Sequence, residues 1–217
     1  MIKHIIFDCD GVLIDTEIVA AEIVSDYLRS EGADISTEHF IKEFTGKTFT
    51  DIINLLKSEN RLGKDVDTAQ VVPQLDDEIR KNQRPIVGAT EMLKGLDLPF
   101  SVVSNSARDY VIEALEKLEV LPIVNNRVFS ADMVDRGKPS PLVYELAVKE
   151  IGLHKHELVV VEDSAAGVTA SVAANLQTIG FLGGSHIRSG HDQRLLDLGC
   201  YTTIKDHTDL SNELKIS

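Results

Sequence analysis

The chain contains little of what base-stacking, disulfide-rich or membrane-spanning proteins use. It has no Trp, only 5% aromatic residues, and two cysteines, Cys9 and Cys200, in 217 residues. Scarce aromatic rings argue against a surface that stacks nucleic-acid bases. Two distant cysteines predict neither a disulfide framework nor a zinc site. Because no apolar run approaches membrane-spanning length and the N-terminus does not resemble a signal peptide, we expect a cytoplasmic protein.

Basic side chains are scarce relative to acidic ones. Lys and Arg total 22 against 35 Asp and Glu, which gives a net charge of −13 at pH 7. That balance argues against binding to nucleic acid or to an anionic membrane as the main activity. An anionic substrate would need a bound cation and nearby lysine side chains to reverse the local field.

The apolar segments form an interrupted α/β pattern. His4–Phe7 is a β-prone apolar run, and Leu158–Val161 is a continuous one, typical of a strand covered on both faces. Between these two runs, residues 16–84 show only helical periodicity. Strands alternate with helices after residue 84. The pattern predicts an α/β fold, in which a Rossmann-like parallel sheet is interrupted by an inserted all-helical domain. The expected domains are residues 1–15 with 85–217, and residues 16–84.

Polar side chains follow the apolar strands at their carboxyl ends. They are Asp8 and Asp10, Ser104 and Asn105, and Glu162 and Asp163. Ligands of open parallel sheets bind outside these ends, so the side chains should converge. Converging carboxylates need a counter-ion, and hard oxygen ligands favour Mg²⁺. The interpretation requires Asp8 and Asp163 to lie near enough to share one cation.

This arrangement suits the transfer of a phosphoryl group. A carboxylate can attack phosphorus, which makes Asp8 the candidate nucleophile. Asp10 can protonate the leaving oxygen and later activate water. Ser104 would offer its hydroxyl and nearby backbone N–H groups to the phosphoryl oxygens, Asn105 would help to bind the substrate, and Lys138 would offer a positive charge.

Each candidate also has an ordinary structural interpretation. An Asp-x-Asp-Gly segment alone is more often a turn or a calcium-type loop. Ser104 and Asn105 could only cap the next helix, and Lys138 could be a solvated loop residue. We expect Cys9 to be a small buried side chain, because an oxygen-rich Mg²⁺ site would not use its thiol.

Four segments, in order, resemble the motifs of the haloacid-dehalogenase-like (HAD) phosphatase superfamily. They are Asp8–Glu17, Val102–Ser106, Lys138-Pro139 with Pro141, and Glu162–Gly167. Residues 16–84 resemble the cap domain of the subgroup that contains β-phosphoglucomutase and small sugar-phosphate phosphatases. The resemblance thus implies a HAD-like core with a helical cap and a small phosphate monoester as substrate. We expect the protein to be a monomer or a weak homodimer.

The resemblance also implies roles for individual residues. Asp8 would form an aspartyl-phosphate, with Asp10 as general acid and base. Mg²⁺ would be bound by the Asp8 side chain, the Asp10 backbone carbonyl and Asp163, with Glu162 as an alternative ligand. Gly46 and Lys47 would lie in a cap loop that contacts the substrate. An ordinary helix–helix turn is an equally good interpretation of that loop.

Several activities are compatible with these motifs. Hydrolysis of sugar or sugar-acid phosphates, 6-phosphogluconate among them, is favoured over mutase action. Mutases resembling β-phosphoglucomutase carry a His in the first cap helix and an Arg after the cap-loop glycine, where this chain has Ala20, Ala21 and Phe49. Dehalogenases of the superfamily lack the acid found here at Asp10. A non-catalytic phosphosugar-binding module would have lost a motif residue, and none is lost.

Overall fold

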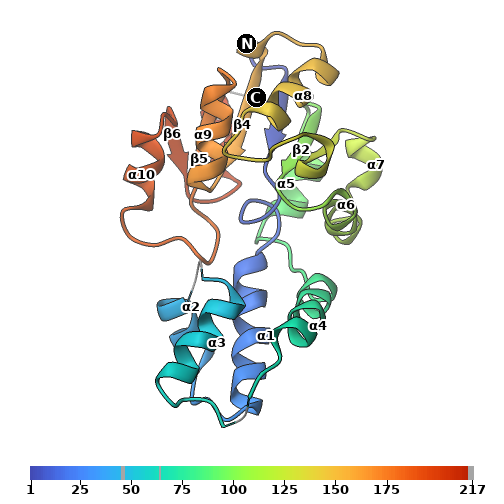
Figure 1. Cartoon of the computed structure of the whole chain (residues 1–217). Coiled ribbons are helices and arrows are strands. Elements are labelled where there is room, and N and C mark those ends of the chain that lie inside the picture. Colours follow the sequence, from blue (N-terminus) through green and yellow to red (C-terminus); the bar gives the residue numbers. More distant parts are fainter. Residues whose placement is uncertain (45–46, 64, 215–217) are drawn as a thin grey trace. The chain divides into compact units, whose positions relative to one another are not determined.

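The structure, a computed structural model, describes residues 1–44, 47–63 and 65–214. The chain divides into two compact units, which we call the core unit and the helical unit (Figure 1). The core unit consists of Met1–Asp15 and Pro85–Ser217, and the helical unit of Thr16–Arg84. No helix in the described part of the chain has both the length and the apolar character needed to cross a membrane.

The core unit is built on a six-stranded parallel sheet with the order β3-β2-β1-β4-β5-β6. The strands are β1 (His4–Phe7), β2 (Phe100–Ser104), β3 (Val128–Ser130), β4 (Leu158–Glu162), β5 (Gln177–Phe181) and β6 (Thr202–Ile204). This doubly wound order places a topological switch point between β1 and β4. The predicted α/β fold with a parallel sheet is confirmed. The short, partly exposed edge strand β6 was not predicted.

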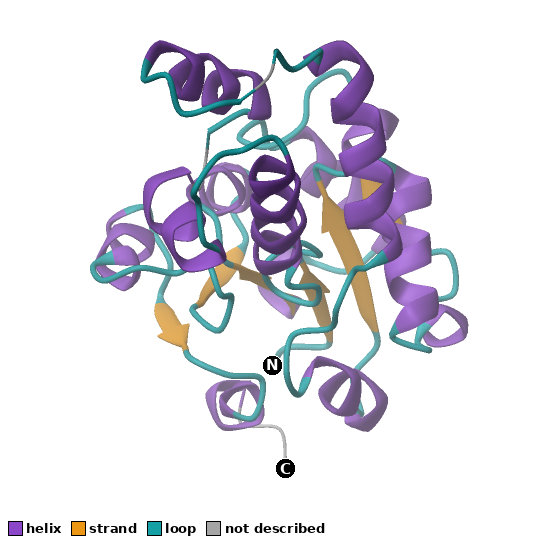
Figure 2. Ribbon diagram, turned by 90° about the horizontal axis from the view of Figure 1, so that it is seen from below, coloured by secondary structure: helices purple, strands orange, loops and turns teal. Residues whose placement is uncertain are grey.

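Helices cover both faces of this sheet, because successive side chains of a strand point to opposite faces. They are α5 (Ala89–Gly95), α6 (Arg108–Lys117), α7 (Leu121–Val124), α8 (Leu142–Ile151), α9 (Ala165–Ala173), α10 (His191–Asp197) and α11 (Asp209–Leu214). Ile5 and Phe7 belong to an apolar cluster shared with α5 and α6. Ile6, between them, belongs to a second cluster shared with α8 and α9. Figure 2 colours the strands orange and the helices purple, so their alternation can be followed.

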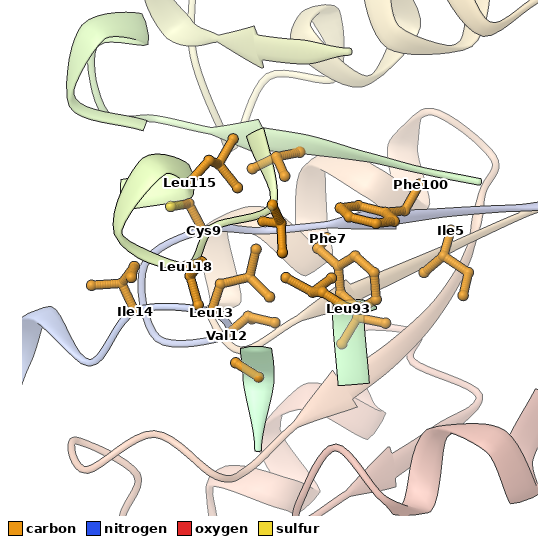
Figure 3. Close-up of a cluster of buried hydrophobic side chains, with 14 of the residues drawn as sticks. Ile5, Phe7, Cys9, Val12, Leu13, Ile14, Leu93, Phe100, Leu115 and Leu118 are labelled. Carbon is orange, nitrogen blue, oxygen red and sulfur yellow. The ribbon is translucent and has the colours of Figure 1, made fainter. Parts of the chain in front are cut away.

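Apolar packing holds the loop that follows β1. Phe7 meets Phe100 edge to face, with ring centroids 5.9 Å apart and an interplanar angle of 79°. Cys9 is fully buried in the same cluster as Leu115 and Leu118 (Figure 3). It is therefore the small buried side chain that was expected, and burial raises the pKa of its thiol well above the usual value. The residues around Asp8 and Asp10 are thus anchored in the core.

Among its described residues, the helical unit contains four helices and no strand. They are α1 (Thr16–Ser30), α2 (Thr37–Phe44), α3 (Phe49–Ser58) and α4 (Thr68–Lys81). Residues spaced three or four apart bury one face of each helix, and Leu28, Ile53 and Leu56 lie at the centre of the resulting cluster. This unit therefore has an apolar core of its own.

Candidate active site

Three acidic side chains meet at the carboxyl ends of β1 and β4. Phe7 lies opposite Val161 in the parallel pair, so Asp8 and Glu162 continue the two strands side by side. The ligand oxygens of Asp8, Glu162 and Asp163 lie within 4.8 Å of one another, and all three residues are buried. Asp8 and Asp163 are therefore near enough to share one cation.

Lys138 joins two of these acids from the loop before α8. Its Nζ donates to Asp8 Oδ1 at 2.5 Å, to Glu162 Oε1 at 2.6 Å and to the Val103 carbonyl at 2.9 Å. Lys138 is only 8% exposed, so the interpretation of a solvated loop lysine is wrong. Burial by itself would lower the pKa of Lys138, but the carboxylates of Asp8 and Glu162 raise it well above the usual value.

The cluster carries more negative than positive charge. Three carboxylates against one ammonium leave a formal charge of −2. Burial first, and then the charge of Glu162, raise the pKa values of Asp8 and Asp163 well above their usual range. Asp163 Oδ1 is buried and has no hydrogen-bond partner among the described residues. Such an oxygen, in a cluster of excess negative charge, fits a hard divalent cation.

Glu162 is more fully engaged with the protein than its two neighbours. Oε1 accepts from Lys138 and, at 3.1 Å, from the Tyr144 hydroxyl, while Oε2 accepts from the backbone N–H and the hydroxyl of Ser164 at 3.0 Å each. A Cβ on Gly167 would lie 1.6 Å from Oε1, so only glycine fits at that position. Asp8 and Asp163 are therefore better placed than Glu162 to hold a cation.

Asp10 is held from the loop after β2. Its Oδ2 accepts from Ser104 Oγ at 3.2 Å and from Ser106 Oγ at 2.7 Å. The Ser106 backbone N–H in turn donates to Ser104 Oγ at 2.9 Å. The hydroxyl of Ser104, which is 1% exposed, thus bonds to Asp10. The expected contact of that hydroxyl with a phosphoryl group stays a prediction, as does a metal contact of the Asp10 carbonyl.

Asn105 holds the backbone of Lys138. Its Nδ2 donates to the Lys138 carbonyl at 3.0 Å, and its Oδ1 accepts from the Lys138 N–H at 2.7 Å. A Cβ on Gly137 would lie 2.5 Å from that Oδ1, so this close approach needs glycine. Helix α6 begins at Arg108 and has Ala107 at its N-cap position without a side-chain cap, so the helix-capping interpretation of Ser104 and Asn105 is wrong.

A family model described as haloacid dehalogenase-like hydrolase matches residues 5–181. The chain belongs to this family. The 6-phosphogluconate phosphatase of Escherichia coli strain K12 is 26% identical in an alignment of 191 positions that covers 85% of this chain and 85% of that protein.

Solved structures of related hydrolases share the fold over nearly the whole chain. A haloacid dehalogenase-like protein of unknown function from Agrobacterium tumefaciens is 32% identical, with a TM-score of 0.81 and coverage of 99% of this chain and 98% of that one. A HAD family hydrolase from Deinococcus radiodurans, with bound phosphate and sodium, is 26% identical. Its TM-score is 0.85, with coverage of 98% of this chain and 95% of that one.

Several residues of this haloacid dehalogenase-like hydrolase were not assigned a role from the sequence. Ser106 donates to Asp10, and Tyr144 donates to Glu162 and has its ring centroid 5.2 Å from the Lys138 ammonium. His186 and His191 contact Asp163. Ser106 follows Ser104 by two residues, a spacing at which a serine hydroxyl often accepts from the backbone. The other three carry no comparable local signal.

The expected cap-loop residues of the hydrolase can be followed only in part. Gly46 lies outside the described residues. Lys47 is exposed and helps to line a hollow of the helical unit together with Glu17, Phe44 and Phe49. A contact of either residue with substrate stays a prediction.

Proposed function

We propose that this hydrolase removes phosphate from small phosphorylated sugars or sugar acids, such as 6-phosphogluconate, in a reaction that depends on Mg²⁺. The observation that carries the proposal is the buried Asp8–Lys138 pair beside Asp163, whose Oδ1 has no protein partner among the described residues. The sugar-acid phosphate used by the Escherichia coli relative and the phosphate bound to the Deinococcus radiodurans protein support this substrate class.

In the first step, an oxygen of the Asp8 carboxylate attacks phosphorus as the bond to the sugar oxygen breaks. Asp10 gives its proton to the departing oxygen, so that the sugar leaves as an alcohol. The product left on the protein is an aspartyl-phosphate at Asp8. Ser104 and Ser106 hold the Asp10 side chain through its Oδ2, whereas Lys138 pairs with Asp8 and Glu162.

In the second step, water releases the phosphate. Asp10, now ionised, takes a proton from water, and the water oxygen attacks phosphorus while the bond to Asp8 breaks. Inorganic phosphate leaves, and both carboxylates return to their starting state. The same residue thus acts first as acid and then as base.

Positive charge makes both steps possible. Lys138 favours the ionised form of Asp8 and lies beside the position of the transferring group, where charge develops. A cation held by Asp8 and Asp163 would neutralise the phosphate and polarise its oxygens. Asn105 fixes the backbone of Lys138 and so contributes through that residue.

The decisive experiment measures phosphate release from a panel of esters, with Mg²⁺ or with EDTA. The panel contains sugar phosphates, sugar-acid phosphates, phosphoglycolate and nucleotides, and Asp8→Asn protein serves as the blank. We expect turnover of sugar or sugar-acid phosphates that requires Mg²⁺ and is absent from the blank. Equal release by the Asp8→Asn protein would refute the assignment of the nucleophile.

The same panel separates the alternative activities. Formation of glucose 6-phosphate from β-glucose 1-phosphate, without release of phosphate, would establish a mutase instead. Tight binding of a phosphosugar without turnover of any ester would identify a non-catalytic binding module. Preferential hydrolysis of nucleotides would contradict the proposed substrate class while leaving the mechanism intact.

A further inference from the structure

Two histidines from the segment after β5 contact Asp163, and no step proposed above uses them. His186 Nε2 lies 2.9 Å from Asp163 Oδ2. His191 Nε2 lies 2.6 Å from the Asp163 carbonyl oxygen. The two rings are 6.2 Å apart and meet edge to face at 84°. The same segment therefore holds both the side chain and the backbone of Asp163.

Two glycines of the surrounding loops lie close against the His186 ring. A Cβ on Gly11, whose φ is +83°, would lie 1.8 Å from Asp163 Oδ2 and 2.9 Å from His186 Cε1. A Cβ on Gly184 would lie 2.7 Å from the same ring carbon. A side chain at either position would meet the imidazole, and the left-handed φ of Gly11 itself favours glycine, so both loops lie close against the ring and its contact with the acid.

A neighbouring hydrogen bond fixes the segment in place. Ser185 Oγ donates to Asp15 Oδ1 at 2.6 Å, which ties the residue before His186 to the end of the first core segment. The His186 side chain is only 18% exposed. A histidine held in this way has few alternative rotamers, so its Nε2 stays directed at Asp163.

The two oxygens of Asp163 are consequently unequal. Oδ2 is occupied by His186, whereas Oδ1 is buried and has no hydrogen-bond partner in the described part of the chain. A carboxylate restrained at one oxygen can offer the other as a single ligand. Side chains that restrain a metal ligand in this way commonly raise metal affinity and fix its geometry.

We propose that His186 is a positioning residue that makes Asp163 a ligand through Oδ1 alone, and that it thereby favours Mg²⁺ over Ca²⁺. The inference rests on the proposed metal site. Mg²⁺ requires a tight octahedron with oxygens at about 2.0–2.1 Å, whereas Ca²⁺ takes more oxygens at about 2.3–2.6 Å and accepts bidentate carboxylates. With Nε2–H of His186 on Oδ2, the bidentate arrangement is blocked.

The test measures Mg²⁺ and Ca²⁺ affinities of the metal-free protein by titration calorimetry at one pH. We expect His186→Ala to bind Mg²⁺ roughly 10–100-fold more weakly. Affinity for Ca²⁺ should fall less or rise, so the preference for Mg²⁺ shrinks. His186→Gln, whose amide N–H can replace Nε2–H, should recover part of the preference for Mg²⁺. His156→Ala, which removes an exposed histidine, is the matched control and should bind both ions as the parent does.

Thermal unfolding in EDTA first establishes that each variant is folded, and His186→Gln carries the test if the alanine variant is not. Because the role of His186 acts through the metal, excess Mg²⁺ should restore phosphatase turnover of the alanine variant. Parent-like affinities for both ions in both His186 variants would overturn the inference. So would turnover that stays low at every Mg²⁺ concentration while Mg²⁺ affinity is unchanged.

Asp163→Asn separates this inference from the function on which it rests. If the variant loses Mg²⁺ binding while the His186 variants keep the parent's preference, the metal site stands and only the positioning role fails. If Asp163→Asn binds Mg²⁺ as tightly as the parent, the proposed metal site itself is wrong. The His186 inference then falls with it.

Discussion

The core unit buries one network of charged side chains, whereas the ion pairs in the described part of the helical unit lie among exposed side chains. In the core unit, Asp8, Glu162 and Lys138 are all less than 10% exposed and share one network of short contacts. In the helical unit, the ion pair of Lys81 with Asp77 is formed by side chains that are 70% and 59% exposed. The same types of residue are therefore surrounded by protein in this network of the core unit and by water in the helical unit.

This contrast shows where charged side chains can take part in catalysis and metal binding. A buried charge is expensive unless it is paired, and its neighbours feel it strongly because water does not screen it. An exposed pair is screened and contributes little. The core unit can therefore shift pKa values and attract a cation, while the helical unit uses charge mainly as a solvated surface around an apolar core.

The largest expected effect is the loss of turnover on substitution of Asp8, which belongs to the buried network. Asp8→Asn should lower turnover by at least roughly 10³-fold, because the amide is a poor nucleophile of similar shape. Phosphate release from the best substrate of the panel measures it. Asp135→Asn, an exposed acid of the core unit, is the control and should keep the parent's rate. Near-parental turnover of the Asp8 variant would erase the functional contrast between the units.

Asp10→Asn should have the next largest effect. The amide cannot exchange a proton, so we expect turnover to fall roughly 10²–10⁴-fold while the protein stays folded. A substrate whose leaving group needs no protonation, such as a nitrophenyl phosphate, should lose less in the first step. An equal loss in the rate of the first step with both kinds of leaving group would argue against an acid role for Asp10.

Removing the buried ammonium group of Lys138 should lower stability as well as turnover. Lys138→Met leaves the carboxylates of Asp8 and Glu162 without their shared partner, and breaking a buried ion pair costs about 3–5 kcal/mol. Denaturant unfolding in EDTA measures the change in the free energy of unfolding. Lys149→Met makes the same substitution at an exposed position of α8. Equal stability of the two variants would mean that the buried lysine contributes no more to stability than the exposed one.

The pH dependence of stability offers a smaller effect in the core unit. Burial lowers the pKa of His207, which stacks on Phe181 at 4.5 Å, from 6.5 to about 4. The folded protein therefore disfavours protonation of His207, whereas the unfolded chain permits it. The free energy of unfolding consequently decreases, through this residue, as pH falls from about 6.5 to about 4. His207→Phe removes this contribution, so the loss of unfolding free energy between pH 7 and pH 5 should be roughly 2 kcal/mol smaller than in the parent.

The histidine experiment has a matched control in the same unit. His156→Phe replaces an exposed histidine and should leave the difference between pH 7 and pH 5 unchanged. Comparing each variant with the parent cancels the contribution of the buried carboxylates, whose raised pKa values act in the opposite direction. An unaltered pH dependence in His207→Phe would show that this residue is not held neutral.

The smallest effect is expected on the surface of the helical unit. Lys81→Ala removes the ammonium that pairs with Asp77, yet both side chains are largely in water. The unfolding midpoint should stay within measurement error of the parent, and added salt should not change that result. A clear destabilisation that disappears in salt would mean that surface charge matters more in this unit than its exposure suggests.

Much of the architecture could be read from the sequence because the signals are local. Apolar runs ending in acids predicted β1 and β4, and helical periodicity without strands predicted the content of residues 16–84. Edge strand β6 was missed because it is short and only partly buried, so it lacks a continuous apolar run. Helix α10 was missed for a related reason, since Leu195 is its only buried residue.

The sequence by itself determined the order of strands β1 to β5 and of the helices α6, α8 and α9 between them. It also brought forward Asp8, Asp10, Lys138 and Asp163, because position after an apolar strand and a Gly-Lys-Pro setting are local features. Only the tertiary structure decided which of them touch, and that His186 and Tyr144 join them. Those contacts link residues distant in the chain, and they form only when the parallel sheet brings separate strand ends and loops together.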